Sequence, residues 1–115
     1  MAFLMQPTSE ADLDRVFQAL SDSTRRSILR RIASSELSIS EIADPYDLTF
    51  AAVSKHLKVL EQARLIARRK DGSFQMISFS PEALKSAGQW LRFYQKFWTT
   101  RLDSLKDLLE NEDTP

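Results

Sequence analysis

The fold is decided by the stretch of residues 49–79, which reads TFAAVSKHLKVLEQARLIARRKDGSFQMISF. The first half of this stretch carries apolar residues at helical spacing. The second half consists of two runs with strand-like composition, joined through Asp71-Gly72. An Asp-Gly pair between two such runs is the strongest short-range signal for a β-hairpin. The stretch therefore predicts a helix over about 49–62 and a hairpin over about 65–79.

The residues before this stretch predict three further helices. Apolar side chains at helical spacing indicate one amphipathic helix over about 9–20 and a second over about 21–34, where Ser and Asp offer an N-cap. Ser38 and Glu41 form a capping-box pattern for a short third helix, which Pro45 ends. In the second helix we expect a buried stripe formed by Ile28, Leu29 and Ile32. Its outer basic face would be formed by Arg25, Arg26, Arg30 and Arg31.

A long last helix is predicted over about 81–109, with Ser80 as its N-cap and Pro81 at its first position. Its apolar residues follow heptad steps and resume after one skip of four residues. The stripe consists of Leu84, Ala87, Leu91, Tyr94, Trp98, Leu102, Leu105 and Leu109, widened by Trp90, Phe93 and Phe97. The order helix, helix, short helix, helix, hairpin, long helix is that of a winged helix-turn-helix. We therefore expect a mainly α (α+β) fold in one domain over residues 1–115.

Composition excludes several classes of chemistry. The chain of 115 residues has no cysteine, so it has no disulfide, thiolate nucleophile or thiolate metal site. His56 is the single histidine, which leaves little basis for a zinc site or a histidine-based triad. No nucleophile and base can be paired, so we expect neither an enzyme nor a cofactor.

Nothing in the sequence predicts a membrane partner or export. No apolar run approaches the roughly 18 residues that a membrane span needs. Residues 1–5 are apolar but too short for a signal peptide, and no basic region precedes them. We therefore expect a cytoplasmic protein.

Charge is balanced overall but segregated along the chain. The net charge is zero, yet residues 22–35 carry four arginines against one aspartate. Residues 49–80 carry six lysines and arginines against two acidic residues. In residues 36–48 the charged residues are all acidic. The two basic segments are where a polyanion such as DNA could dock.

The helix over 49–62 is the predicted recognition helix, because its buried side leaves an opposite side that could enter a major groove. Its N-terminus could meet a phosphate, and the hairpin tip could follow the DNA backbone or minor groove as a wing. His56 reads most simply as a packing or polar contact beside the wing, with direct DNA contact as the alternative. The candidate DNA-binding residues are Thr49, Phe50, Ala51, Ser54, Lys55, His56 and Lys58 on the helix and Arg68, Arg69 and Lys70 on the wing.

The aromatic stripe of the last helix predicts a dimer interface. A monomer of this size could hardly cover so wide an apolar stripe, and large exposed apolar patches usually mark partner surfaces. A small-molecule pocket between the first and last helices is the alternative, for which the sequence names no ligand. The interface residues expected in the last helix are Trp90, Leu91, Tyr94, Phe97, Trp98, Leu102 and Leu105.

Two stretches resemble a known family. Residues 17–29 (FQALSDSTRRSIL) resemble the opening of ArsR/SmtB-type winged-helix repressors, and residues 52–66 (AVSKHLKVLEQARLI) resemble their recognition helix and first strand. The likeness covers about residues 10–109. It implies a homodimeric transcriptional regulator, usually a repressor, whose first and last helices form the dimer interface. The resemblance thereby adds Leu13 and Phe17 of the first helix to the interface residues.

The chain departs from this family at the sites that would sense a metal. Ser38 and Ser40 stand where metal-sensing members carry a Cys-x-Cys pair, and a neutral hydroxyl is a poor ligand for soft metals. The family's alternative site needs histidines on the last helix, which has none. Phe50 and Ala51 stand where polar residues are common, so the family's base preference does not transfer.

We therefore expect a repressor that binds a pseudo-palindromic operator without sensing metal at these sites. The alternatives are a metal- or ligand-responsive repressor of the same fold and a protein-interaction module that does not bind DNA.

Overall fold

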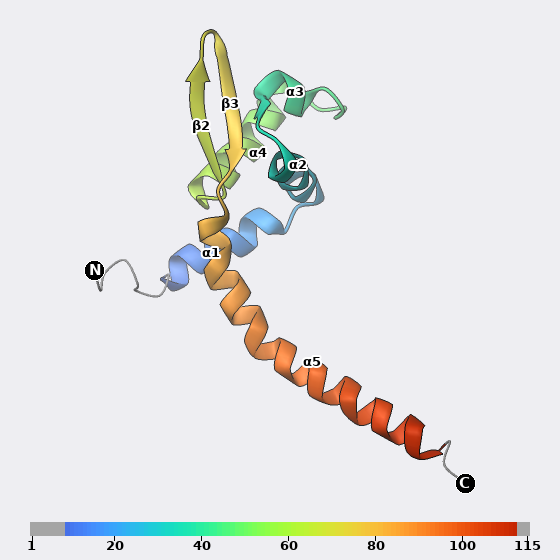
Figure 1. Cartoon of the computed structure of the whole chain (residues 1–115). Coiled ribbons are helices and arrows are strands. Elements are labelled where there is room, and N and C mark those ends of the chain that lie inside the picture. The colour runs from blue at the N-terminus through green and yellow to red at the C-terminus, as the bar shows by residue number, and fades with distance from the viewer. Residues whose placement is uncertain (1–8, 113–115) are drawn as a thin grey trace.

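The computed structural model describes residues 9–112. The N-terminal residues 1–5 considered above lie outside this part of the chain. Five α-helices and a small antiparallel sheet follow one another along this part of the chain (Figure 1). The elements are α1 (Glu10–Leu20), α2 (Ser23–Ser34), β1 (Leu37–Ser38), α3 (Ile39–Ala43), α4 (Phe50–Gln62), β2 (Ile66–Asp71), β3 (Phe74–Phe79), the 3-10 turn η2 (Pro81–Ala83) and α5 (Leu84–Glu112).

The predicted helix starts are confirmed at α2, α3 and α4. Asp22 caps α2 by accepting a hydrogen bond from the backbone N–H of Arg25 at 3.0 Å, and Thr49 caps α4 by accepting one from Ala52 at 3.1 Å. At α3 the capping box is complete, because Ser38 and Glu41 each accept from the other's backbone N–H. Asp22, Ser38 and Thr49 therefore set where these helices begin.

The start of the last helix differs from the prediction. The side chain of Ser80 makes no capping hydrogen bond, and the chain first forms the 3-10 turn η2 before α5 begins at Leu84. Pro81 still occupies the first position of the turn, where its missing N–H costs nothing.

The sheet has one strand more than predicted. The two-residue strand β1 pairs antiparallel with β3, giving the order β1-β3-β2. The hairpin turn also lies one residue later than expected, because Asp71 still pairs with Phe74 and leaves Gly72 and Ser73 as the turn. Gly72 has φ +62°, the positive value that the first position of such a two-residue turn requires.

The junction between α4 and β2 is a Schellman motif. The N–H of Leu65 donates to the carbonyl of Leu60 at 3.0 Å, and that of Arg64 donates to Glu61 at 2.9 Å. Arg64 adopts φ 60°, a left-handed conformation that glycine usually supplies at this position. This motif sets the angle at which the hairpin leaves α4.

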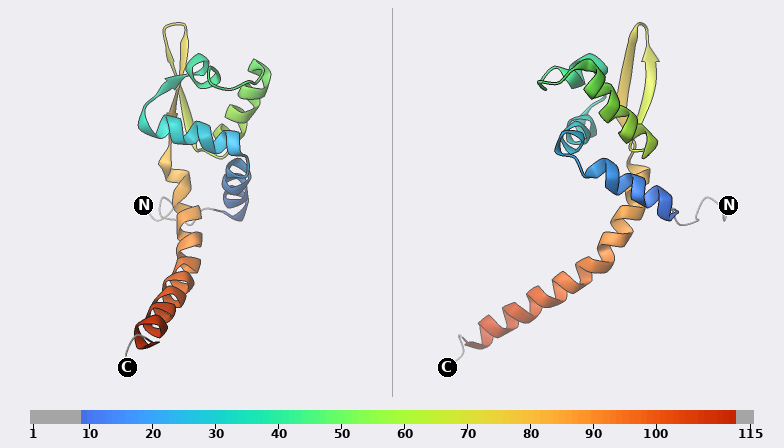
Figure 2. Two further views of the ribbon diagram at one scale, coloured as in Figure 1. Left: turned by 90° about the vertical axis from the view of Figure 1, so that its right-hand side faces the viewer. Right: turned by 180° about the vertical axis from the view of Figure 1, so that it is seen from behind.

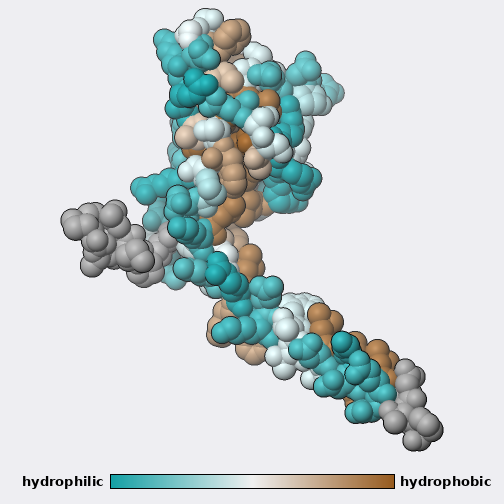
Figure 3. All heavy atoms as spheres, viewed as in Figure 1, coloured by the Kyte–Doolittle hydropathy of each residue, from teal (hydrophilic) through white to brown (hydrophobic). Residues whose placement is uncertain are grey.

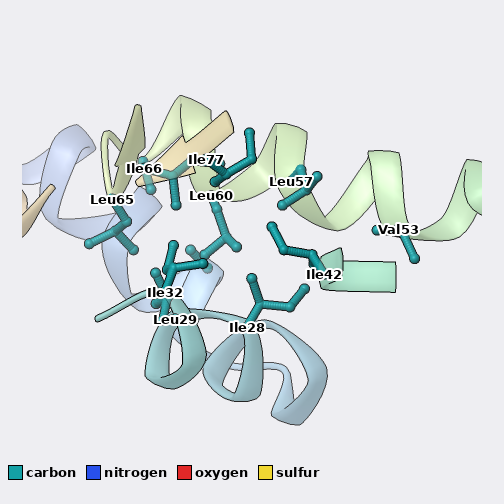
Figure 4. Close-up of a cluster of buried hydrophobic side chains, with 12 residues drawn as sticks. Ile28, Leu29, Ile32, Ile42, Val53, Leu57, Leu60, Leu65, Ile66 and Ile77 are labelled. Atoms are coloured by element: carbon teal, nitrogen blue, oxygen red, sulfur yellow. The ribbon is translucent and has the colours of Figure 1, made fainter. Parts of the chain in front are cut away.

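The core lies between α2, α4 and the base of the hairpin (Figure 4). The predicted buried stripe of α2 is confirmed, since Ile28, Leu29 and Ile32 all lie in the core. They pack with side chains from α3, α4, the strands and the junction between α4 and β2, namely Ile42, Val53, Leu57, Leu60, Leu65, Ile66 and Ile77. The prediction that all four arginines of α2 point outward is wrong for Arg25 and Arg31, which are half-buried.

The last helix extends far beyond this core. Figure 2 shows the β2–β3 hairpin and α5 projecting towards opposite ends of the molecule. The radius of gyration is 19.5 Å, whereas about 13 Å is usual for a compact chain of this length. Every residue from 89 to 111 is exposed, and apolar patches reach the surface along this helix (brown in Figure 3).

Candidate nucleic-acid interface

One side of α4 is fixed in the core, which orients the other. Val53, Leu57 and Leu60 are completely buried, so the opposite side of the helix points away from the core. On this outer side Lys55 and Lys58 are exposed and Ser54 is half-buried. The outer side of α4 thus presents two cations and a hydroxyl that can serve a phosphate or a base edge.

The N-terminal end of α4 is apolar at its surface. The side chain of Phe50 is 67% exposed, and Ala51 beside it is also exposed. The exposed Thr49 accepts the capping hydrogen bond from Ala52, which leaves its hydroxyl hydrogen free to donate. Apolar groups at such a helix end can contact thymine methyl groups in a major groove.

Strand pairing divides the three hairpin cations between two faces. Arg68 pairs with the buried Ile77, and Lys70 pairs with Gln75, so Arg68, Lys70 and Gln75 lie on the face whose base enters the core beside α4. Arg69 points to the opposite face, because successive side chains on a strand alternate. The sequence alone did not assign these cations to different faces of the hairpin, whereas the strand pairing does.

Each hairpin arginine is paired with a carboxylate. Arg68 donates from Nε to Glu61 of α4 at 2.7 Å, which braces the hairpin against that helix. On the reverse face, Nε of Arg69 lies 2.9 and 3.0 Å from the two carboxylate oxygens of Glu36. The hydrogen bond with Glu36 raises the pKa of Arg69 above its ordinary value. A shallow hollow of about 230 Å³ lies among Arg68, Arg69, Lys70 and Gln75.

His56 faces α2 rather than the outer side of α4. Its ring is 20% exposed, and Nδ1 lies 3.2 Å from Nη1 of Arg25 and 3.9 Å from a carboxylate oxygen of Asp22. The capping bond from the N–H of Arg25 holds the pKa of Asp22 below its ordinary value. His56 therefore makes a polar contact, but with Arg25 at the start of α2 rather than beside the wing, and its direct contact with DNA stays a prediction.

The arginines of α2 are largely used inside the fold. Arg25 and Arg26 donate to backbone carbonyls at the C-terminal end of α1, which lacks a basic residue in its last turn. Arg31 donates to the carbonyls of Ile42 and Glu41 at 2.8 and 2.7 Å and lies over the ring of Tyr46. The basic segment 22–35 is therefore mainly a set of helix C-terminal caps rather than a free cationic surface.

The serine at the first position of the absent Cys-x-Cys pair is committed to the fold. Ser38 is 6% exposed, and its hydroxyl accepts the capping bond from Glu41 at 3.1 Å. The bond from the N–H of Ser38 in turn holds the pKa of Glu41 below its ordinary value. Within residues 9–112, no group of three or more His, Cys, Asp or Glu residues could hold a metal ion.

An aromatic network joins α1 to α5. Phe17 meets Trp90 edge-on, with ring centroids 5.6 Å apart, and Trp90 contacts Tyr94 at 4.6 Å. Phe93 and Phe97 continue the series along α5. Leu13 is half-buried like Phe17, whereas every interface residue predicted in α5 is exposed, as are Phe93, Leu108 and Leu109.

The residues that connect these elements were not predicted from the sequence. Glu36 and Glu61 looked like ordinary acidic residues, and their pairing with the hairpin becomes visible only in three dimensions. Arg25 stood in a basic run that predicted an exposed face. Its position three residues after the N-cap Asp22, on the same helix turn, was the one local sign of a structural role.

Comparison with known proteins places this geometry in context. Residues 20–69 match the model of a helix-turn-helix domain. The HTH-type transcriptional regulator Rv2034 of Mycobacterium tuberculosis is 37% identical over 99 residues, covering 86% of this chain and 90% of that protein. The transcriptional repressor SdpR of Bacillus subtilis is 30% identical over 79 residues, covering 69% of this chain and 88% of the relative.

A solved structure agrees with these relatives. The crystal structure of an ArsR family transcriptional regulator superposes with a TM-score of 0.73 at 30% sequence identity. The superposition covers 82% of this chain and 97% of that one.

No helix within residues 9–112 is long and apolar enough to cross a membrane.

Proposed function

Because the chain belongs to the ArsR family of winged helix-turn-helix, DNA-binding transcriptional regulators, we propose that it is a homodimeric repressor of a pseudo-palindromic operator. The name of the relative SdpR, a transcriptional repressor, supports repression over activation. In this proposal residues 1–115 form one domain, with α4 as the recognition helix, the β2–β3 hairpin as the wing and α5 as the dimerisation helix. We place its action in the cytoplasm, where we expect its DNA partner.

The observation that carries the proposal is the outer side of α4. Lys55 and Lys58 are exposed beside Ser54, on a helix whose inner side is locked in the core. Two such helices in a dimer would enter successive major grooves, about one helical turn apart. We propose that Ser54 and Lys55 contact base edges, while Thr49, Phe50 and Ala51 approach the DNA at the N-terminal end of the helix.

The wing is proposed to contact the DNA backbone through its α4-side face. Arg68 and Lys70 share that face, and an exposed ion pair such as that of Arg68 with Glu61 contributes only about 0–1 kcal/mol, so a phosphate can replace the carboxylate. Arg69 is on the reverse face and held by Glu36, so we propose a smaller contribution from it.

Dimerisation is proposed because the apolar face of α5 stays exposed in the described part of the chain. A hollow of about 300 Å³ on this helix is lined by residues of α5 alone, Phe93, Lys96, Phe97, Thr100 and Arg101, so it is not a pocket between helices. A second copy with the same apolar stripe could cover Trp90 to Leu109.

The proposal names neither a metal nor a catalytic role. In the described part of the chain the acidic residues and His56 do not gather into a ligand set. Equilibrium dialysis with zinc or cadmium tests this directly, and tight stoichiometric binding would replace the proposal with a metal-responsive repressor.

The test begins with selection of bound sequences from a random duplex pool. Fluorescence anisotropy on the selected duplex and on a scrambled one then separates the two kinds of contact. Lys55→Ala and Ser54→Ala should reduce the preference for the selected duplex, whereas Arg68→Ala should weaken both duplexes alike and lower the salt slope by roughly 0.9 per phosphate lost.

Two matched controls accompany these variants. Arg69→Ala removes the same side chain on the reverse face of the wing and should have a smaller effect. Lys85→Ala removes an exposed lysine outside α4 and the wing and should leave binding unchanged. Equal losses on both duplexes for every variant would refute the division between base and backbone contacts.

A further inference from the structure

Arg25 connects three elements of the fold through one guanidinium group. Nε donates to the carbonyl of Ala19 at 2.8 Å and Nη2 donates to that of Gln18 at 3.0 Å, both at the C-terminal end of α1. Nη1 reaches α4 and lies 3.2 Å from Nδ1 of His56. The α1 carbonyls thus hold the guanidinium in place while it faces the imidazole.

The contact between Arg25 and His56 requires one protonation state. A guanidinium only donates hydrogen bonds, so Nδ1 of His56 must accept. The imidazole is then neutral, with its proton on Nε2. Because Nδ1 carries no proton in this state, it cannot also donate to the nearby carboxylate of Asp22.

A second partner for the same nitrogen has the opposite requirement. The carboxylate of Asp22 lies 3.9 Å from Nδ1, and a carboxylate can pair with this atom only when Nδ1 carries a proton. Protonation of His56 therefore removes the acceptor for Arg25, places two cations side by side and favours Asp22. One ring nitrogen has two neighbours that require opposite states.

The charged groups that contact the ring belong to the start of α2. In the described residues, Asp22 is the one carboxylate within ion-pair distance of the ring, and it belongs with Arg25 to the start of α2. From α1, backbone carbonyls accept hydrogen bonds from Arg25, which in turn contacts the ring. On α4 itself, the neighbouring Lys55 is exposed. β2 meets α4 further along, where Arg68 pairs with Glu61.

We propose that Arg25 and His56 are positioning residues for DNA binding: neutral His56 ties α4 to the end of α1 through Arg25, and protonated His56 releases it. The proposal rests on the proposed function in one respect, that α4 is the helix that reads DNA. It also links α4 to α1, the helix whose Phe17 packs on Trp90 of α5, so the α1–α5 contact and the DNA-reading helix share one hydrogen-bonded connection.

The proposal predicts a direction opposite to that of simple electrostatics. Histidine ordinarily changes charge between about pH 5 and 8, and an added cation near DNA would strengthen binding as the pH falls. Release of α4 instead weakens binding to the selected duplex as the pH falls. The sign of the pH dependence therefore distinguishes a positioning role from a charge that contacts phosphate.

The first test measures affinity for the selected duplex from about pH 8 to about pH 5.5 at constant salt. Wild type should lose affinity about tenfold, the effect of losing one hydrogen bond to a charged group. His56→Asn keeps an acceptor near the position of Nδ1 but does not titrate, so it should bind like wild type at high pH and show no pH dependence.

His56→Leu, which has no acceptor, should bind weakly at every pH. An affinity of wild type that rises on acidification, or a pH profile of His56→Asn that matches wild type, would overturn the proposal.

The second test does not depend on DNA. His56 is the single histidine of the chain, so the imidazole ¹⁵N signals of the untagged protein need no assignment by mutation. At high pH we expect the tautomer with the proton on Nε2, and Arg25→Lys should change the Nδ1 signal while circular dichroism confirms the fold. A proton on Nδ1 at high pH would refute the contact. Failure of wild type to bind any duplex would instead refute the proposed function, and the ¹⁵N result would still stand.

Discussion

The head of the molecule, residues 9–88, and its arm, residues 89–112, use the same apolar residue types in opposite ways. In the head, isoleucines and leucines from α2, α3, α4 and the strands are buried in one cluster. In the arm, leucines and aromatic residues at equally regular spacing remain exposed along a single helix. The spacing is similar, so the difference lies in whether another element of the same chain packs against it.

This contrast teaches that the head is complete within one chain and the arm is not. Within residues 9–112, no buried polar side-chain atom is left without a hydrogen-bond partner, and each helix of the head has its N-terminus capped or its C-terminal carbonyls engaged. In the arm, by contrast, the apolar side chains stay exposed. Stability measurements should therefore report on the head, and association measurements on the arm.

The largest expected effect is in the core of the head. Leu60→Ala removes a fully buried side chain of α4 and leaves a cavity between α2 and the hairpin, which should lower the free energy of unfolding by about 2–5 kcal/mol. Urea unfolding followed by circular dichroism measures this loss at a protein concentration where wild type and variant have the same oligomeric state. Leu102→Ala is the matched control in the arm, and an equal loss there in monomeric protein would break the contrast.

The next effect is in association. Leu102→Glu places a charge in the apolar stripe of the arm and should weaken the proposed dimer by about thirtyfold or more, as expected for a residue at the centre of an interface. Sedimentation equilibrium measures the change. Thr99→Glu adds the same charge on the polar side of α5, among Arg92, Gln95 and Lys96, and should leave dimerisation intact. Identical behaviour of these two variants would show that the stripe is not the interface.

Local patterns were sufficient to predict most of the head. The caps Asp22 and Ser38 act within three residues along the chain, so the sequence alone located them. β1 was missed because two residues carry no detectable alternation, and its strand conformation depends on pairing with β3. Ser80 shows the converse, since a suitable residue type does not cap a helix that begins with a 3-10 turn.

The candidate site was predicted less completely, because its contacts join residues far apart in the sequence. The outer side of α4 followed from helical spacing, but the contacts of Arg69 with Glu36 and of Arg25 with His56 are separated by 33 and 31 residues. Which face of the hairpin each cation occupies depends on strand register, and a shift of one residue would exchange Arg68 and Arg69.

A smaller effect tests how strongly the head depends on its caps. Asp22→Ala removes the N-cap of α2 and should lower stability by about 1 kcal/mol near neutral pH, whereas Asp22→Asn retains a capping oxygen and should lose less. The pKa of Asp22 is lowered in the folded state, so its stabilising effect is present above the ordinary pKa and is lost as the pH falls through the folded value. Thermal unfolding at several acidic pH values should show the difference between wild type and Asp22→Asn shrinking towards low pH. A difference that stays constant would contradict the linkage.

The smallest expected effect is a gain in stability at the junction of α4 and β2. Arg64 has φ 60°, and Arg64→Gly should relieve a strain of about 1–2 kcal/mol, partly offset by about 0.4–1 kcal/mol because glycine makes the unfolded chain more flexible. Gln62→Gly, two residues earlier and still helical, is the matched control and should lower stability by about 1 kcal/mol.

The increment from Arg64→Gly also tests the independence of the two regions. Distant sites without shared partners contribute additively, so the gain should be the same in the Leu102→Glu background as in wild type once both are compared as monomers. A gain that disappears in that background would mean that the arm supports the head across the length of α5, and the head would not be complete by itself.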